Sequence, residues 1–282
     1  MTACWHRNFQ LTESVALDDR GLQYGDGLFE TVAVRAGKPR LLRYHHERLI
    51  RGGDVLGLSI LSMTDLTAQI DSALLAHDEK LDDCTVKIVI TAGTGERGYA
   101  RAKVTEPNVF IGVFPSRALP TVAYKDGVTA RLCKTRLASG SVFAGLKTLN
   151  RLEQVLARSE LSKSDDFEGL TMDVDGHIIC GTMSNVFFVI DNQLLTPPLD
   201  RCGVEGVMRR HIFDVANDSD LDIELAPIHE SMLAGVDEVF ISNSQIGVVP
   251  VRQCGTFRKG AGEQTRRLMA LLAASGISEC RI

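Results

Sequence analysis

One lysine stands where its amine could do chemistry. Lys147 precedes segment 148–159, in which apolar residues at 149, 152, 155 and 156 recur at intervals of three and four and predict an amphipathic helix. Because Lys147 lies before that helix, its amine is not committed to the solvated helix face. A lysine that is partly buried at the edge of an element can lose its proton and form an imine with an aldehyde. On this segment alone, an ordinary surface lysine is the more common interpretation.

A second basic residue has the chemistry of an anion ligand. The pattern over 41–58 predicts a helix that carries His45 and Arg48 three residues apart, and therefore on one face. The planar guanidinium of Arg48 could offer a fork of donors to a phosphate. An arginine on a solvated helix face is again the more common interpretation of the segment alone.

The elements that must position these residues alternate between strands and helices. Segment 115–120 contains two prolines and is the best candidate for a linker, which predicts a small N-terminal domain over 1–117 and a larger domain over 118–282 that carries Lys147. Asp175 and Gly176 are typical of a tight hairpin turn. The predicted strands span 28–34, 85–91, 109–114, 128–134, 170–174, 177–180, 186–190, 193–196 and 238–242, and the remaining predicted helices span 66–76, a segment that starts within 203–209, and 263–274.

Composition excludes several classes of function. The 282 residues carry a formal net charge of −5, which argues against a nucleic-acid or anionic-membrane surface. No apolar run approaches the roughly 20 residues of a membrane span, and the N-terminal segment lacks the apolar core of a signal peptide. Seven cysteines without a C-x-x-C pair predict free thiols in a reducing cytoplasm rather than a disulfide framework or a zinc site.

Three motifs resemble those of one enzyme family. They are D-R-G-x-x-Y-G-D-G-x-F-E-T over 19–31, H-x-x-R-L over 45–49 and K-x-x-N-R-L-E-Q-x-L-A over 147–157. Together they resemble the fold-type IV, class IV aminotransferase-like enzymes, which use pyridoxal 5′-phosphate, and the lysine motif is most similar to that of the 4-amino-4-deoxychorismate lyases. The resemblance implies a two-domain α/β fold like that of D-amino-acid aminotransferase, and a homodimer with its active sites near the interface.

The resemblance also implies a role for each matching residue. Lys147 would form the imine with the cofactor and later move a proton, and Arg151 would lie near the cofactor's 3′-oxygen. The triplet Arg97-Gly98-Tyr99 resembles a loop that lines the substrate side, so Arg97 and Tyr99 are candidate substrate ligands. The expected phosphate cup consists of Arg48, Ser244, and the backbone amides of Val207 and Met208 at the start of a helix.

The chain departs from the family at one site position. The family motif reads Glu-Gly-Thr-x-Ser-Asn, with the glutamate paired to the pyridine nitrogen of the cofactor, whereas this chain has Cys180 in the place of the glutamate. A carboxylate would keep the ring nitrogen protonated and the cofactor strongly electron-withdrawing, but a neutral thiol offers only a weak hydrogen bond.

The resulting functional prediction is a lyase that converts 4-amino-4-deoxychorismate to 4-aminobenzoate and pyruvate for folate synthesis. Its product ring becomes aromatic, which supplies a driving force that transamination lacks, so Cys180 favours a lyase over an aminotransferase. Two alternatives stay open. One is an aminotransferase of the same fold, for D-amino acids or branched-chain amino acids, and the other is a homologue that binds the cofactor with weakened or no catalysis.

Overall fold

The computed structural model describes residues 4–77, 82–101 and 106–282, and the chain divides into two compact units. Unit 1 comprises Met1–Arg117 together with Leu146–Asn150, and unit 2 comprises Ala118–Gly145 and Arg151–Ile282. The short segment that carries Lys147 thus belongs to unit 1, although the chain on both sides of it belongs to unit 2.

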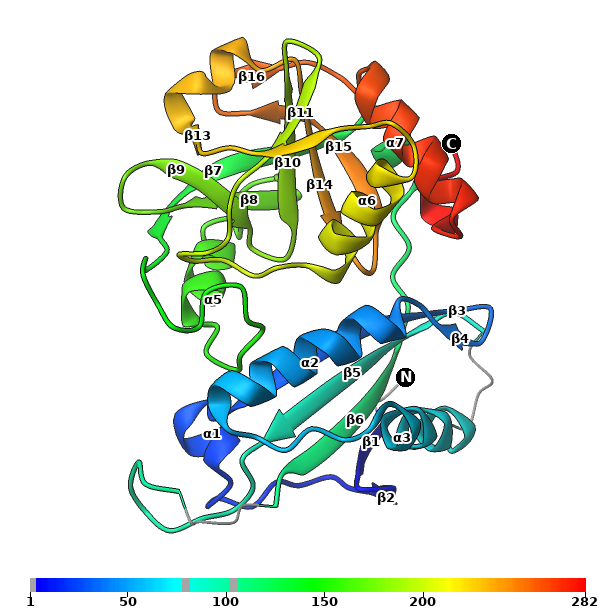
Figure 1. Cartoon of the computed structure of the whole chain (residues 1–282), viewed down its shortest axis with the longest axis vertical. Coiled ribbons are helices and arrows are strands. Elements are labelled where there is room, and N and C mark those ends of the chain that lie inside the picture. Colours follow the sequence, from blue (N-terminus) through cyan, green and yellow to red (C-terminus); the bar gives the residue numbers. More distant parts are fainter. Residues whose placement is uncertain (1–3, 78–81, 102–105) are drawn as a thin grey trace. The chain divides into compact units, whose positions relative to one another are not determined.

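Unit 1 is built on an antiparallel sheet whose described strands number six, in the order β2-β1-β6-β5-β3-β4 (Figure 1). Its strand β5 alternates between buried and half-buried residues, as the β-branched run around Val86, Ile88 and Ile90 predicts. The strands are β1 (Cys4–Arg7), β2 (Gln10–Leu11), β3 (Gly27–Arg35), β4 (Lys38–Pro39), β5 (Cys84–Thr91) and β6 (Asn108–Pro115).

Two helices, α2 (Leu42–Leu56) and α3 (Met63–Leu75), supply the helical half of the unit 1 core. Leu49 of α2 and Ile70 of α3 are fully buried with the strand residues. Because α2 turns one face to the sheet, its three-residue spacing carries His45 and Arg48 into the same buried layer.

A short helix was missed in the glycine-rich segment that precedes β3. Helix α1 (Arg20–Tyr24) begins after Asp19, whose side chain accepts a hydrogen bond from the Gly21 amide, and ends at Gly25 in the left-handed conformation (φ 65°). An aspartate before a helix and a glycine after it are the usual start and stop signals, so the sequence contained the information.

The segment that carries Lys147 is extended, not helical. The Lys147 carbonyl accepts a hydrogen bond from the Phe29 amide at 3.0 Å, and the Leu149 amide donates to the Gly27 carbonyl at 3.0 Å. The segment therefore adds to the edge of β3, and α5 (Leu152–Ser159) starts only after it. The prediction that Lys147 precedes the helix is confirmed.

The predicted apolar face of that helix exists in the sequence, but the structure does not bury it. Leu152, Val155 and Leu156 are mostly exposed, whereas Ala157 is fully buried beside Cys133. The reason is that α5 packs on unit 2 through its smallest side chain, which allows close approach to the sheet. Periodicity locates an apolar stripe but does not say which stripe is covered.

Unit 2 contains a mixed sheet of ten described strands in the order β12-β11-β10-β14-β15-β7-β8-β9-β13, with β16 paired to β15. Strand β7 runs parallel to both β15 and β8, and most other pairs are antiparallel. The elements are α4 (Thr121–Lys125), β7 (Val128–Arg136), α5, β8 (Glu168–Met172), β9 (His177–Gly181), β10 (Asn185–Ile190), β11 (Gln193–Thr196), α6 (Val207–Asn217), β12 (Ile223–Leu225), β13 (Ile228–His229), η1 (Glu230–Gly235), β14 (Glu238–Asn243), β15 (Gly247–Cys254), β16 (Phe257–Arg258), α7 (Glu263–Ala274) and η2 (Ser278–Cys280).

The predicted hairpin at Asp175 and Gly176 is confirmed, since β8 and β9 pair antiparallel around it and Gly176 has φ 87°. The predicted strand at 193–196 and the predicted helix at 263–274 match β11 and α7 in their bounds. Among the described residues, no helix combines the length and the apolar character needed to cross a membrane.

Candidate functional site

Lys147 is half-buried at the edge of the unit 1 sheet. Its backbone pairing with β3 places its side chain on the same side of the sheet as that of Phe29, and its Nζ lies 4.2 Å from the centre of the Phe29 ring. The ring presents its negative face to the amine, so it holds the amine through a cation–π contact. The main chain of the lysine is thus fixed by two hydrogen bonds while its amine faces an aromatic surface.

Arg48 lies in a fully buried group of three side chains. Its Nε donates to one Glu30 carboxylate oxygen at 2.7 Å and its Nη2 donates to the other at 2.5 Å. The second oxygen is also 2.6 Å from His45 Nδ1. The prediction that His45 and Arg48 share one face is confirmed, because both reach the same carboxylate from α2.

The charges in this group are well defined. Burial alone would raise the pKa of the Glu30 carboxyl, but the charge of Arg48 and the hydrogen bonds donated by His45 and Arg48 lower it to about 2. Burial and the nearby cations Arg48 and Lys147 lower the pKa of His45, against the opposing effect of Glu30. His45 is therefore neutral and donates through Nδ1, while its buried Nε2 has no hydrogen-bond partner among the described residues. The group combines one anion, one cation and one neutral imidazole.

The two candidate substrate ligands lie in the loop that follows β5. Arg97 is exposed, and the Tyr99 side chain is 89% exposed. The ring of Tyr99 packs edge-on against Tyr24 of α1, with centroids 5.6 Å apart. Both side chains are thus available to a ligand, and neither belongs to the buried group of Glu30, His45 and Arg48.

In unit 2, the N-terminus of α6 presents backbone amides of the kind that can bind an anion. Helix α6 has Gly206 at its N-cap, with no side-chain hydrogen bond capping it, and the next residues, Val207 and Met208, are buried. The first amides of a helix have no acceptor within the helix and carry its positive dipole end. A Cβ on Gly206 would lie 2.0 Å from Asn185 Oδ1, so only glycine fits this approach.

Two loops are tied to this helix start. Asn185 accepts from the Gly206 amide at 3.0 Å and donates to the Val204 carbonyl at 2.9 Å. Asn243 donates to the Met183 carbonyl at 3.2 Å and accepts from two amides of the turn that holds Ser244. Hydrogen bonds therefore link the start of α6, the loop 183–185 and the turn that holds Ser244 in one assembly of unit 2.

Glu168 is the organising carboxylate of this assembly, and sequence reasoning missed it. It is fully buried, and its oxygens accept from the hydroxyl of Thr182 at 2.5 Å and that of Ser184 at 2.7 Å. The amides of Gly169, Thr182 and Met183 donate to it as well. Two hydroxyl residues two positions apart in Gly181–Asn185 were a signal that this loop turns around a buried acceptor.

The side chain of Cys180 lies in an apolar cluster with Ile179, Leu199 and Cys202. Its thiol is 5% exposed and lies 3.5 Å from the Thr171 hydroxyl. Burial raises the pKa of Cys180 to about 11, so the thiol is protonated and neutral at physiological pH.

Arg151 precedes α5 as its N-cap and interacts electrostatically with Cys180. Burial lowers the pKa of the Arg151 guanidinium, opposed by Cys180 and Glu153. The structure therefore places these two predicted ligands in one neighbourhood of unit 2, with a cation present and no carboxylate at position 180.

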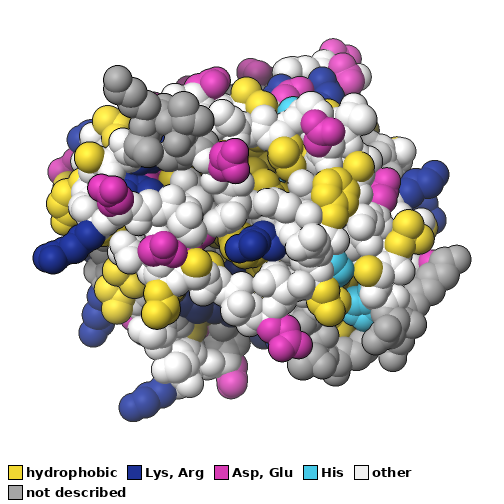
Figure 2. All heavy atoms as spheres, turned by 90° about the horizontal axis from the view of Figure 1, so that it is seen from below, with side chains coloured by type: hydrophobic (Ala, Val, Ile, Leu, Met, Phe, Trp, Pro, Cys, Tyr) yellow, Lys and Arg dark blue, Asp and Glu magenta, His cyan; other side chains and the backbone are white. Residues whose placement is uncertain are grey.

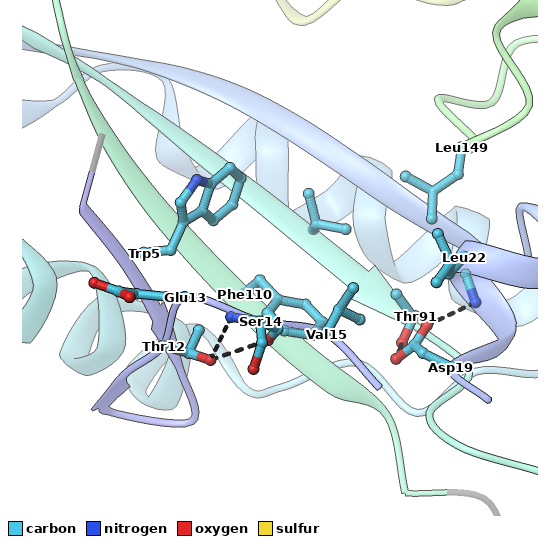
Figure 3. A pocket seen from close by; sticks show the side chains of 12 residues that line it. Trp5, Thr12, Glu13, Ser14, Val15, Asp19, Leu22, Thr91, Phe110 and Leu149 are labelled. Carbon is cyan, nitrogen blue, oxygen red and sulfur yellow. Dashed lines mark hydrogen bonds between the residues drawn. The ribbon is translucent and has the colours of Figure 1, made fainter. Parts of the chain in front are cut away.

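A separate cavity of about 380 Å³ lies in unit 1, and none of the predicted site residues is among those that line it. Figure 3 shows Trp5 and Phe110 along its wall, with Asp19 and Thr91 hydrogen-bonded to each other at one end. On the face drawn in Figure 2, described basic and acidic side chains are intermixed and form no continuous basic patch.

Comparisons with known proteins agree on one family. The family model for class IV amino-transferases matches residues 27–254. An aminodeoxychorismate lyase from Vibrio harveyi is 35% identical over 84% of this chain and 86% of its own length. A putative branched-chain-amino-acid aminotransferase from Methanocaldococcus jannaschii is 28% identical over 90% of this chain and 88% of its own.

The fold agrees with the same relatives. The crystal structure of 4-amino-4-deoxychorismate lyase from Pseudomonas aeruginosa superposes with a TM-score of 0.89 and 38% identity, covering 97% of this chain and 99% of that one. The predicted α/β fold of the D-amino-acid aminotransferase type is thereby confirmed. From the family match, the relatives and the fold together, we conclude that the chain belongs to the class IV aminotransferase family.

Proposed function

We propose that the protein is a pyridoxal 5′-phosphate-dependent lyase that converts 4-amino-4-deoxychorismate to 4-aminobenzoate and pyruvate. The observation that carries this proposal is that sequence identity is higher to relatives named as this lyase than to relatives named as aminotransferases. Identity is 35% and 38% to two proteins named as this lyase and 29% to a third, against 28% and 26% to relatives named as aminotransferases. The motif that follows Lys147 points the same way.

The residues fit the phosphate end of this cofactor. The amides of Val207 and Met208, at the start of α6, would donate to a phosphate, and the connected turn supplies Ser244. The guanidinium of Arg48, oriented by Glu30, would add a charge-assisted donor. Lys147 would hold the cofactor covalently through its amine, and Arg151 would lie near the 3′-oxygen.

When bound, the cofactor would withdraw electrons from the substrate carbon that bears the amine. Lys147 Nζ would accept the proton from that carbon, and its place over the Phe29 ring keeps the amine oriented for the transfer. The enolpyruvyl group would leave from the neighbouring ring carbon, and the six-membered ring would become aromatic. Arg97 and Tyr99, which are exposed on the loop after β5, would bind the substrate.

The residues do not fit the nitrogen end of the cofactor in the usual way. Cys180 is buried in an apolar cluster and stays protonated, so it supplies no negative charge to a ring nitrogen. A reaction driven by aromatisation depends less on that charge than transamination does. The same observation supports the alternative of a homologue with weakened catalysis, and the experiment below separates the two.

The proposal extends to the setting of the enzyme. Its product, 4-aminobenzoate, is a building block of folate, so we propose a role in folate synthesis in the cytoplasm. We also propose a homodimer, as the family resemblance implies, which gel filtration with light scattering would test. A monomeric mass with full turnover at low concentration would contradict the dimer.

The test is the variant Lys147→Ala. We expect turnover of 4-amino-4-deoxychorismate to fall by several orders of magnitude, because the variant loses both the covalent attachment and the proton acceptor. Borohydride reduction of the protein with pyridoxal phosphate should label one peptide, the one that contains Lys147, as mass spectrometry would detect. The matched control is Lys87→Ala, since Lys87 Nζ also lies over the Phe29 ring, at 5.6 Å.

Each outcome decides between the candidates. Labelling of Lys147 with lyase turnover supports the proposal, and labelling with amino-group transfer alone supports the aminotransferase. Labelling without either reaction identifies a binding homologue. Labelling of another lysine contradicts the assignment of Lys147.

A further inference from the structure

Arg20 is a buried arginine whose two terminal nitrogens face one short stretch of backbone. Its side chain is 4% exposed. Its Nη1 donates to the carbonyl of Gly98 at 2.9 Å and to that of Ala100 at 3.4 Å, and its Nη2 donates to the carbonyl of Tyr99 at 3.0 Å. One guanidinium therefore satisfies three successive carbonyls of the loop that follows β5, which lies beside α1 (Figure 1).

Asp26 fixes this guanidinium in its orientation. Its carboxylate accepts from Arg20 Nε at 2.9 Å and from Arg101 Nε at 2.8 Å. Burial alone would raise the pKa of Asp26, but hydrogen bonds from Arg101 and Arg20 lower it, so the carboxylate stays charged. Arg101 also donates to the Leu56 carbonyl at the end of α2. Arg20 thus binds residues 98–100 of the loop, and Arg101 ties the adjoining position to Asp26 and to the end of α2.

Tyr24 completes the contact from the same helix. Its hydroxyl accepts from the Gly98 amide at 3.0 Å, and its ring lies 4.9 Å from the Arg20 guanidinium carbon. Gly98 has φ 119°, a conformation that side chains rarely adopt, so the loop turns at this point. Near the start of the same loop, the Arg20 backbone amide donates to the Gly93 carbonyl at 2.8 Å.

The chemistry of this contact requires arginine. A planar fork can reach three carbonyls at once, whereas a lysine ammonium is a point charge that cannot span them. Because the carbonyls of residues 98–100 all accept hydrogen bonds from Arg20, this one side chain fixes the main chain of the loop. The side chains of Arg97 and Tyr99 stay exposed, and the Tyr99 ring packs edge-on against Tyr24.

We propose that Arg20 is a positioning residue for substrate binding: with Asp26 and Tyr24 it holds the backbone of 98–100 so that Arg97 and Tyr99 are presented in one fixed arrangement. The inference rests on the proposed function, in which those two side chains bind the substrate. It assigns a task to the Arg20, Tyr24 and Asp26 positions of the glycine-rich N-terminal motif.

The test is Arg20→Lys in the full chain loaded with pyridoxal phosphate. We expect the KM for 4-amino-4-deoxychorismate to rise at least about tenfold while kcat changes little, because charge-assisted hydrogen bonds that fix the loop are lost. Amide hydrogen exchange at 98–100 should accelerate by a similar factor. The matched control is Arg43→Lys, because Arg43 is an exposed arginine of unit 1 that pairs with Glu47.

A second variant tests the proposal independently, in case Arg20→Lys does not fold. Tyr24→Phe removes the acceptor for the Gly98 amide and keeps the ring, so KM should rise about threefold, by the loss of one neutral hydrogen bond. An unchanged KM in both variants overturns the proposal, as does an equal loss of kcat and kcat/KM. Faster exchange with an unchanged KM also overturns it, since the loop would then be held for stability alone.

Failure of the proposed function gives a different pattern. The variants Arg97→Ala and Tyr99→Phe remove candidate substrate contacts without disturbing Arg20. If both leave KM unchanged, the substrate role of the loop fails and the positioning proposal falls with it. If they raise KM and Arg20→Lys does not, only the positioning proposal is overturned.

Discussion

Glu30 in unit 1 and Cys180 in unit 2 are both buried positions of family motifs, yet the first is charged and the second is neutral. Glu30 is an anion whose pKa is lowered to about 2, while Cys180 is a neutral thiol whose pKa is raised to about 11. Burial acts in the same direction on both, since it disfavours the charged form of each. The difference comes from the donors around them.

Three donor contacts from Arg48 and His45 reach the Glu30 carboxylate at 2.5 to 2.7 Å. Around Cys180 the neighbours are mostly apolar, with one hydroxyl at 3.5 Å and the more distant charge of Arg151. The comparison teaches that a buried group keeps its charge where oriented donors outweigh desolvation, and loses it where they do not.

Removal of the unit 1 carboxylate is expected to have the largest effect. Glu30→Ala leaves the Arg48 guanidinium buried without its carboxylate, which should lower the free energy of unfolding by about 3–5 kcal/mol. Cys180→Ala removes only a small neutral group and should lower it by about 1 kcal/mol. Urea unfolding of both variants measures the contrast, and equal losses would contradict it.

The two groups should also respond to opposite ends of the pH scale. Glu30 has a lowered pKa, so its stabilisation of about 3 kcal/mol is complete above pH 4.5 and is lost as pH falls toward 2. Cys180 has a raised pKa, so its stabilisation is complete below pH 9 and is lost as pH rises toward 11. The thermal unfolding temperature, measured as a function of pH, would detect both the loss of stability at acidic pH and the loss at alkaline pH. Glu30→Gln should reduce the loss of stability at acidic pH only, and Cys180→Ser should reduce the loss at alkaline pH only, to which Cys202, with a pKa also raised to about 11, contributes as well.

The phosphate role of Arg48 can be separated from its structural role. The double variant Glu30→Gln with Arg48→Gln removes both charges together, so neither is left buried alone. We expect its stability to recover relative to Glu30→Ala, while affinity for pyridoxal phosphate weakens by about 1.5–3 kcal/mol, the scale of a charge-assisted hydrogen bond. Unchanged affinity in a dialysis measurement would limit Arg48 to a structural role.

The smallest expected effect is a change of reaction preference. Cys180→Glu would place a carboxylate near Arg151, and a protonated cofactor nitrogen would supply a second opposite charge that lets it ionise. We expect the ratio of transamination to lyase turnover to rise about tenfold, the equivalent of 1.4 kcal/mol. Cys180→Ser is the control, because it keeps the position neutral.

Two outcomes would count against the specialised role of Cys180. If Cys180→Glu restores lyase turnover from near zero, the natural chain is a weakened enzyme. If the glutamate changes neither reaction, residue 180 does not act on the cofactor nitrogen.

The sequence predicted local features well and long-range partners poorly. The position of Lys147 before its helix, the shared face of His45 and Arg48, and the hairpin at Asp175 followed from residue spacing alone. Spacing could not reveal that both α2 residues converge on Glu30, because the pairing joins a helix and a strand through the fold.

The same limit explains the other omissions. Arg20 meets its loop across 78 to 80 residues, and Glu168 meets Ser184 across 16. Periodicity carries no information at such separations, whereas a buried charge demands partners wherever the chain can supply them. For α5, the pattern gave the helix, but the covered side is set by the neighbouring sheet and Ala157.

The extended segment Leu146–Asn150 has a consequence for the order of folding. The first 117 residues leave the ribosome before it, but the edge of β3 lacks its partner until Thr148 has been synthesised. Until then the Phe29 amide and the Gly27 carbonyl form an open strand edge, which invites pairing with other chains. A fragment ending at Arg117 would keep this open edge permanently, so unit 1 is completed only when translation has passed through the first 28 residues of unit 2, Ala118–Gly145.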